Sequence, residues 1–183
     1  MRSWFLSVAF VFAVPDGNLA HAADMTSVCP DCRLHFGVGG TYHYWGTTGG
    51  VVVPITVTWD RDRYEVGAFR MASSQGFYNT RFQSSMRLAE PYWGFSASRR
   101  WELIRAPHWR LMFGLGAAYR SAEDSLTASH WNFAEQLGLR IVPTPQTAIE
   151  LTMRHWSNAG LKLPNRGQDF ATMTVVFSLQ PPG

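Results

Sequence analysis

Residues 109–120 read WRLMFGLGAAYR, and this stretch decides the fold. One set of alternate positions carries the residues Trp109, Leu111, Phe113, Leu115, Ala117 and Tyr119. The positions between them hold two arginines, glycines, an alanine and one methionine. A period of two places alternate side chains on opposite faces of a β-strand. The stretch therefore predicts a strand with one apolar face and one mixed, more polar face.

The same alternation recurs along most of the chain, and no segment has the apolar period of a convincing amphipathic helix. Residues 63–72 alternate poorly. Eight strands are predicted, at about residues 34–44, 51–59, 63–72, 91–101, 109–120, 129–142, 147–157 and 169–179. Eight is an even number, as bacterial outer-membrane barrels require. We therefore expect an all-β fold, an eight-stranded antiparallel up-and-down transmembrane β-barrel, which is too narrow to be a pore.

The direction of the apolar face separates a soluble barrel, which would bury it, from a membrane barrel, which would turn it to lipid. If both chain ends are periplasmic, the aromatic residues of this face gather at the two ends of the barrel. They are Trp59, Trp101, Trp109 and Phe177 below and Tyr42, Tyr44, Trp93, Tyr119 and Trp131 above. Two aromatic girdles around an aliphatic band are typical of a membrane barrel. The apolar face is therefore expected to contact lipid.

The connections between the predicted strands are uneven in length. Short turns at residues 60–62 and 142–146 lie below, and longer loops at 73–90, 121–128 and 158–168 lie above. This asymmetry is that of outer-membrane barrels, which have short periplasmic turns and long external loops. Two connections fit less well, because residues 102–108 are long for a lower turn and residues 47–50 are short for an upper loop.

The N-terminus has the pattern of a secretory signal peptide over residues 1–23. A positive charge at Arg2 precedes an apolar run at residues 4–14, and Ala20-His21-Ala22 is a small-x-small cleavage site. The run is too short for a membrane helix, which needs about 20 apolar residues. The expected organisation is a signal peptide over 1–23 and a single barrel domain over 24–183. Residues 24–33 would form an N-terminal periplasmic segment.

Residues 154–170, RHWSNAGLKLPNRGQDF, hold the candidate chemistry. His155 and Ser157 are two positions apart and so share a face of a strand, and Asp169 follows twelve residues after Ser157. A hydroxyl nucleophile, an imidazole base and an orienting acid are the groups that serine ester hydrolysis requires. Their parity puts all three on the lipid-facing wall, at the upper ends of two strands joined by one loop. Near the interface a charged side chain costs only about 0–1 kcal/mol.

The same string resembles the signature of PagL-type lipid A 3-O-deacylases. The family pattern is His-x-Ser-Asn, a small residue or glycine, then Pro-Asn-x-Gly and an acid. It is matched here by the following residues: His155, Ser157, Asn158, Gly160, Pro164, Asn165, Gly167 and Asp169. The family acid is typically glutamate, so Asp169 is a departure that shortens the orienting side chain by one carbon.

The resemblance implies an outer-membrane enzyme that hydrolyses the ester-linked 3-hydroxyacyl chain at the 3 position of lipid A. His155 would be the base, Ser157 the nucleophile and Asp169 the orienting acid. Donors from Asn158, Gly160 or Asn165 would bind the oxyanion or position the substrate. No metal or other cofactor is expected. The expected location is the outer membrane, with the site facing the outer leaflet.

Other interpretations remain open. Glu135 and Glu150 are alternative orienting acids, although Glu150 has the wrong parity and Glu135 belongs to a different strand. The chain could also be a non-enzymatic barrel for adhesion or membrane integrity, or a soluble periplasmic binding barrel. Cys29 and Cys32 are read as a local disulfide or two idle thiols, since two cysteines do not complete a zinc site.

The net charge of +3 is too small to indicate nucleic-acid binding. Fifteen of the sixteen basic residues are arginine, with Lys162 the single lysine. The planar guanidinium suits phosphate, so lipid A phosphates are natural partners, although a genomic bias towards arginine explains the count equally well. The expected partners are lipid A or lipopolysaccharide as substrate and the membrane. The oligomeric state is open, with a homodimer among the options.

Overall fold

The computed structural model describes residues 29, 31–43, 46–72, 77–79, 84–86, 91–124 and 127–179. The predicted signal peptide lies outside the described residues. The strands within them are β1 (Arg33–His43), β2 (Gly46–Trp59), β3 (Tyr64–Ala72), β4 (Phe77–Asn79), β5 (Ser84–Met86), β6 (Tyr92–Arg105), β7 (Trp109–Arg120), β8 (Trp131–Ile141), β9 (Thr147–Ser157) and β10 (Gln168–Ser178). None of the described segments is a helix long and apolar enough to cross a membrane.

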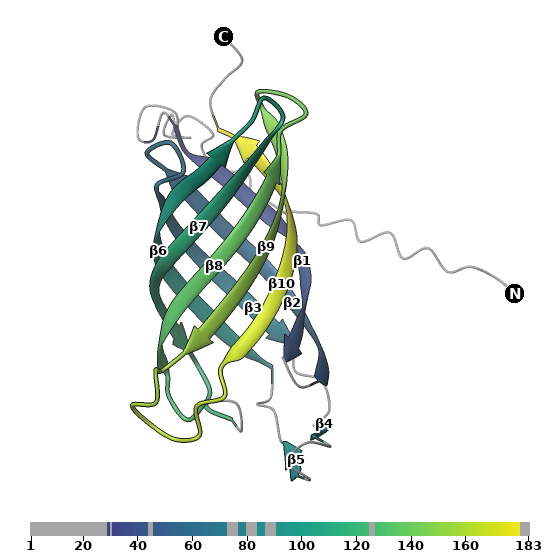
Figure 1. The fold of residues 1–183 in the computed structure, drawn as a ribbon, viewed down its shortest axis with the longest axis vertical. Helices are drawn as coiled ribbons and strands as arrows, with labels where there is room; N and C mark the ends of the chain where they lie inside the picture. The colour runs from purple at the N-terminus through teal and green to yellow at the C-terminus, as the bar shows by residue number, and fades with distance from the viewer. Residues whose placement is uncertain are drawn as a thin grey trace, which may run out of the picture.

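Eight of these strands close into a barrel in the order β1-β10-β9-β8-β7-β6-β3-β2 (Figure 1). Every neighbouring pair is antiparallel. The short strands β4 and β5 pair with each other in the connection between β3 and β6, outside the barrel. The predicted fold class is therefore confirmed.

The two connections that fitted poorly have simple explanations. Strand β6 continues to Arg105, so its turn to β7 spans only residues 106–108 and is closed by the Ala106 N–H donating to the Trp109 carbonyl at 2.9 Å. Strand β2 begins at Gly46, so residues 47–50 belong to the strand and not to a loop. The β4–β5 hairpin was not predicted.

The outer wall of the barrel is apolar and its interior is polar. Along β8 the residues alternate strictly between exposed and buried, with Leu137 and Leu139 outside and Gln136 and Arg140 inside. Met153 and Met173, on neighbouring strands, are 53% and 54% exposed in the isolated chain. A continuous apolar wall of this extent is satisfied by lipid and not by water. The soluble-barrel interpretation does not fit this arrangement.

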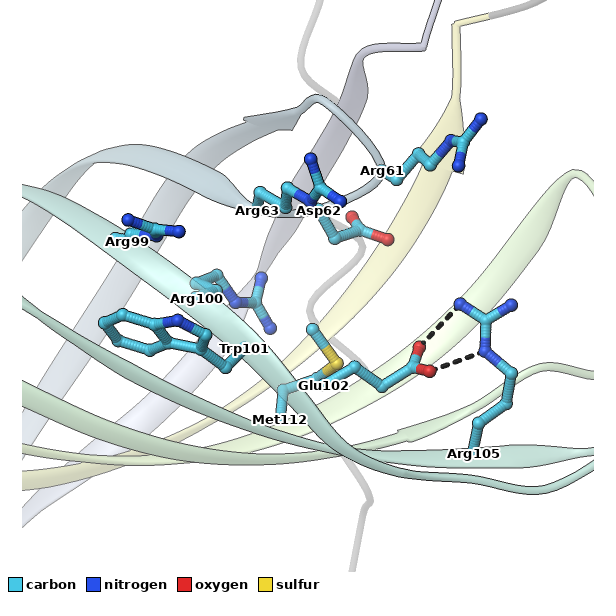
Figure 2. Close-up of a pocket in the computed structure, with 9 residues that line it drawn as sticks. All are labelled: Arg61, Asp62, Arg63, Arg99, Arg100, Trp101, Glu102, Arg105 and Met112. Atoms are coloured by element: carbon cyan, nitrogen blue, oxygen red, sulfur yellow. Dashed lines mark hydrogen bonds and ion pairs between the residues drawn. The ribbon is translucent and has the colours of Figure 1, made fainter.

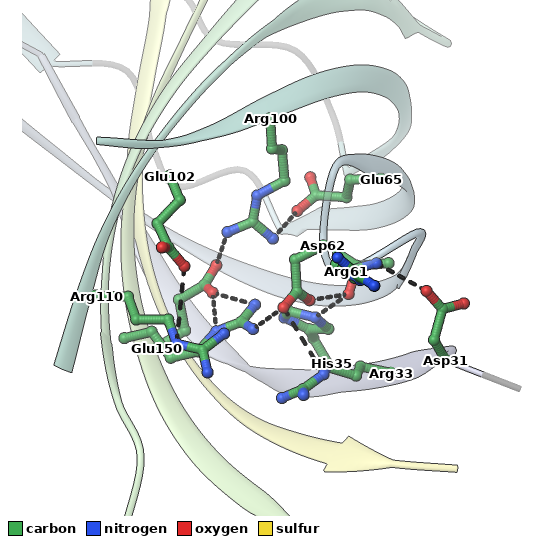
Figure 3. Close-up of polar contacts among 12 residues, drawn as sticks. Asp31, Arg33, His35, Arg61, Asp62, Glu65, Arg100, Glu102, Arg110 and Glu150 are labelled. Carbon is green, nitrogen blue, oxygen red and sulfur yellow. Dashed lines mark hydrogen bonds and ion pairs between the residues drawn. The ribbon is translucent and has the colours of Figure 1, made fainter. Parts of the chain in front are cut away.

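Charged side chains fill the interior near one end of the barrel (Figure 3). Glu65 accepts from Arg100 at 3.1 Å and from Arg154 at 2.7 Å. Glu150 accepts from Arg100 at 2.8 Å and pairs with Arg140 at 2.6 Å. Each buried carboxylate thus meets two guanidinium groups, which neutralises charge that the lumen could not otherwise hold.

This ionic network lies towards the end that carries the short connections 60–63, 106–108 and 142–146, which we call the turn end. The opposite end, with the β4–β5 hairpin and the 158–167 connection, is the loop end and is the lower one in Figure 1. At the turn end Cys29 and Cys32 form a disulfide, with a Cα–Cα distance of 5.3 Å. The Leu179 N–H donates to the Cys32 carbonyl at 3.0 Å, which joins the two ends of the barrel chain.

Aromatic side chains fill the interior near the loop end. Trp156 of β9 meets Phe69 and Phe170 edge-on, with ring centroids 5.2 and 5.0 Å apart. Gly94 of β6 makes room for this indole, because a Cβ there would lie 2.5 Å from its Cζ3 atom. Since side chains alternate along β9, the inward Trp156 anchors the stretch whose outward neighbours are His155 and Ser157.

Candidate active site

Three polar residues form a row across the outer wall near the loop end. His155 on β9 lies opposite Asp169 on β10 and opposite Glu135 on β8. All three side chains have the parity of the lipid-facing residues, as predicted for His155 and Asp169. A polar row on an otherwise apolar wall is unusual because water cannot reach it as it would on a soluble protein.

His155 and Asp169 form a direct hydrogen bond. The Nδ1–H of His155 donates to Asp169 Oδ1 at 2.7 Å, and the two side chains are 38% and 13% exposed. A carboxylate at Nδ1 fixes the tautomer in which Nε2 carries the lone pair. The pair therefore presents Nε2 as a base.

Ser157 lies two residues beyond His155 on the same face, opposite Phe133 of β8. Same-face neighbours on a strand are roughly 6–7 Å apart at Cα. Within the described part of the chain, the Ser157 hydroxyl makes no hydrogen bond to His155, and the side chain is partly exposed. Such contacts are often long in the free state of an enzyme and tighten when substrate binds.

Gly167 fixes the position of the imidazole ring. Its φ is +77°, and a Cβ there would lie 2.2 Å from His155 Cε1 and 3.0 Å from Nε2. The ring thus packs directly on the glycine backbone. Any side chain at this position would strain the backbone and displace the ring.

The 158–167 loop is organised by two asparagines. Asn165 Oδ1 accepts from the Asn158 N–H at 3.0 Å, and the Asn158 side chain accepts from the Gly160 N–H at 3.0 Å. The Asn158 amide also donates to the Lys162 carbonyl at 2.7 Å. The polar groups predicted to bind an oxyanion or position the substrate are therefore engaged in hydrogen bonds within the loop.

A second loop braces the first from the side. Thr127 and Asn165 form a β-bridge, and Lys162 Nζ lies 2.9 and 3.0 Å from the two carboxylate oxygens of Glu123. The hydrogen bond from Lys162 lowers the pKa of Glu123, so that carboxylate stays ionised. These contacts hold the 158–167 loop over β9 at the loop end of the barrel.

A shallow groove of about 190 Å³ extends from the polar row along the wall between β7, β8 and β9. Glu135 and His155 line one part of it, and Phe113, Leu137 and Met153 line another. Phe113, Leu137 and Met153 are cross-strand neighbours and lie closer to the middle of the barrel than the polar row does. The groove can hold a short stretch of hydrocarbon beside the imidazole.

The alternative acids separate clearly in the structure. Glu150 lies inside the barrel in the ionic network, so it is not an orienting acid for His155. Glu135 does face His155, although it lies on a different strand. A cross-strand pair depends on strand register, which no local motif encodes, so sequence reasoning ranked Glu135 low. Among the described residues, no group of three or more His, Cys, Asp and Glu side chains is arranged to hold a metal ion.

The fold and this row of residues define a class, the integral membrane β-barrels with a row of polar residues on the lipid-facing wall. Within that class, the chain belongs to the lipid A 3-O-deacylase (PagL) family, whose family model matches residues 30–178. The predicted resemblance is therefore confirmed.

Individual relatives agree with this assignment. The chain is 26% identical over 159 residues to the lipid A deacylase PagL of Bordetella bronchiseptica, covering 79% of this chain and 80% of that protein. The crystal structure of the outer membrane enzyme PagL matches with a TM-score of 0.55 at 17% identity, covering 79% of this chain and 98% of the other. Neisserial surface protein A (NspA) matches with a TM-score of 0.54 at 10% identity, covering 80% and 94%. At these identities the two structural matches show a shared fold only.

Proposed function

We propose that this protein is an outer-membrane lipid A deacylase that hydrolyses the ester-linked 3-hydroxyacyl chain at the 3 position of lipid A. The observation that carries the proposal is the His155–Asp169 hydrogen bond on the lipid-facing wall, beside Ser157. Family membership and the deacylase relative support the same activity. The loop end of the barrel would face the outer leaflet, where lipid A resides.

In this mechanism His155 Nε2 takes the proton of the Ser157 hydroxyl as Ser157 Oγ attacks the ester carbonyl carbon. The tetrahedral oxyanion collapses, the bond to the glucosamine oxygen breaks, and His155 returns the proton to that oxygen. His155 then removes a proton from a water molecule that attacks the acyl carbon. The bond to Ser157 Oγ breaks, His155 returns the proton to Oγ, and the 3-hydroxy fatty acid is released. Asp169 would keep the imidazole in the required tautomer and stabilise it while it is charged.

Asn158, Gly160 and Asn165 would act through the loop that they organise. By holding residues 158–167 in one conformation, they would position the donors that bind the oxyanion beside Ser157. Each preorganised donor of this kind is typically worth about 3–4 kcal/mol of transition-state stabilisation. The adjoining groove would receive the acyl chain, since its lining is largely apolar.

The direct test is hexa-acylated lipid A incubated with the full-length protein refolded in detergent and read by mass spectrometry. We expect loss of one 3-hydroxyacyl group, abolished in Ser157→Ala and in His155→Asn. Ser129→Ala, which changes a loop serine bonded to the Trp131 carbonyl, is the matched control and should retain activity.

Unchanged lipid A with correctly folded wild-type protein would contradict the proposal. A non-enzymatic barrel for adhesion or membrane integrity would then be the better interpretation, and in that case Ser157→Ala would have no effect in any assay.

A further inference from the structure

A second polar hollow, whose lining residues Figure 2 shows, lies at the turn end, whereas the candidate active site lies at the loop end. The β3–β6 ladder ends at the Tyr64–Arg99 pair, followed by the Arg100 N–H donating to the Arg63 carbonyl at 2.6 Å. Strand β6 continues to Arg105, and this extension pairs with β7. The wall therefore has a step here, and a hollow of about 270 Å³ occupies it.

The hollow has an excess of positive charge. Five arginines and two carboxylates line it: Arg61, Arg63, Arg99, Arg100, Arg105, Asp62 and Glu102. Arg100 and Asp62 are neutralised within the interior network, and Arg105 is paired with Glu102.

The remaining three arginines are the ones available to a ligand. Arg63 has only an exposed contact of 3.5 Å with Asp60. The backbone N–H of Arg61 donates to the Asp31 carboxylate at 2.7 Å. Among the described residues, neither the Arg61 nor the Arg99 guanidinium has an ion-pair partner. Planar guanidinium groups without carboxylate partners are suited to phosphate, which they can bind through two parallel hydrogen bonds.

One side of the hollow is open to the lipid-facing wall. Arg99 has outward parity, and its guanidinium lies 5.4 Å from the centre of the Trp101 ring. Trp101 is 38% exposed and stacks on Phe113 at 6.2 Å, within the aromatic girdle of the turn end. An arginine that bends from the apolar wall to an interfacial tryptophan places its charge at head-group depth.

We propose that this hollow binds the phosphate of an anionic glycerophospholipid in the leaflet at the turn end. Two features favour a lipid over a soluble anion: the adjoining apolar wall, and a position at the depth of the aromatic girdle. Basic pockets at this depth suit lipid head groups. The candidate active site lies at the loop end, so this site would take a lipid of the opposite leaflet and is independent of deacylation.

The test is native mass spectrometry of the refolded full-length protein, loaded from mixed micelles containing phosphatidylglycerol or phosphatidylcholine. We expect the wild type to retain phosphatidylglycerol at least tenfold more than phosphatidylcholine. The triple variant Arg61→Gln/Arg63→Gln/Arg99→Gln should lose this preference. The matched control is Arg70→Gln, because Arg70 also lies 5.4 Å over a tryptophan, Trp93, but at the loop end and outside the hollow.

Heat-modifiable migration on gels shows whether each variant has folded. If the triple variant does not refold, the single variant Arg99→Gln is tested in its place. Equal retention of the two lipids, or a preference that survives in the arginine variants, would overturn the proposal. Inorganic phosphate provides the second arm, read as a shift in melting temperature. A shift with phosphate that depends on the same arginines, without any phosphatidylglycerol preference, would assign the hollow to a soluble anion and overturn the lipid assignment.

Discussion

At the scale of single residues, the candidate site depends on the contact of His155 with a carboxylate on one side and a glycine on the other. Asp169 reaches Nδ1 at 2.7 Å, so the aspartate is long enough to orient the ring despite the glutamate typical of the family pattern. Gly167 sets the depth of the ring against the backbone. The following predictions concern these residues.

Asp169→Asn should reduce kcat by about 100-fold or more, because an amide can no longer stabilise the charged imidazole. Losses of about 10⁴ are known for the equivalent change in serine proteases. Glu135→Gln should cost only a few-fold, since Glu135 faces His155 across the ladder and no hydrogen bond joins these two described side chains. Initial rates of lipid A deacylation measure both. A larger loss from Glu135→Gln than from Asp169→Asn would mean that the orienting acid is Glu135.

Gly167→Ala should reduce kcat/KM by roughly 100-fold while leaving the barrel folded, because a displacement of about 1 Å in a catalytic group has an effect of this size. Gly160→Ala is the matched comparison. Its φ is +80°, so it carries the same backbone strain, but nothing lies within 4 Å of its Cβ position. Equal losses in the two variants would show that loop strain, and not contact with the imidazole, is responsible.

At the scale of elements, β9 carries the outward site residues while its inward side chain Trp156 is clamped between β3, β6 and β10. Phe69 and Phe170 contact the indole, and Gly94 leaves room for it. The position of the outer cluster therefore depends on packing across the whole width of the lumen.

Gly94→Ala should lower the free energy of unfolding by about 1–3 kcal/mol, the usual cost of overpacking an interior. It should also lower deacylation, although Gly94 lies on β6 and the site lies on β9 and β10. Gly138→Ala is the control, because the nearest atom to its Cβ position is Glu150 Oε1 at 3.4 Å. Urea unfolding in detergent, followed by tryptophan fluorescence, measures the difference. Equal stability of the two variants would count against the clamp.

At the scale of the whole molecule, the barrel is stabilised inside by paired charges and outside by lipid. Removing one carboxylate from the network leaves guanidinium charge without a partner. Glu150→Gln should therefore destabilise the protein by about 3–5 kcal/mol, the typical cost of breaking a buried ion pair. Glu123→Gln removes an exposed partner of Lys162 and should leave the unfolding midpoint nearly unchanged. A Glu150→Gln midpoint equal to that of wild type would contradict this account.

Asp62, in the turn between β2 and β3, should make the stability of the protein depend on pH in the acid range. Burial raises the pKa of Asp62, but Arg140 at 2.6 Å, the Thr58 hydroxyl at 2.6 Å and Arg33 outweigh it and lower that pKa from 3.8 to about 2. A pKa lowered on folding stabilises the protein fully above the unfolded value, and the contribution is lost as the pH falls from about 4 to 2. The loss is about 2 kcal/mol. Asp62→Asn should remove this part of the pH dependence, and an unchanged acid profile in that variant would contradict it.

Sequence reasoning predicted the strands and their outward faces well, because alternation is local and one side of every barrel strand must meet lipid. It placed His155, Ser157 and Asp169 on one wall for the same reason. It did not predict that β6 continues to Arg105, beyond the residues that pair with β3. A strand segment that is paired on one side only has no distinctive sequence pattern. It also ranked Glu135 low and did not foresee the contact of Gly167 with the imidazole, because both depend on register and on a loop folding back.

The outward position of the His155 row has a kinetic consequence. A lipid substrate would reach this cluster by lateral diffusion within the leaflet. The rate of encounter between enzyme and substrate would therefore depend on the mole fraction of the substrate among the surrounding lipids. Diluting the leaflet with inert lipid should slow turnover even when the total concentrations of enzyme and substrate are unchanged.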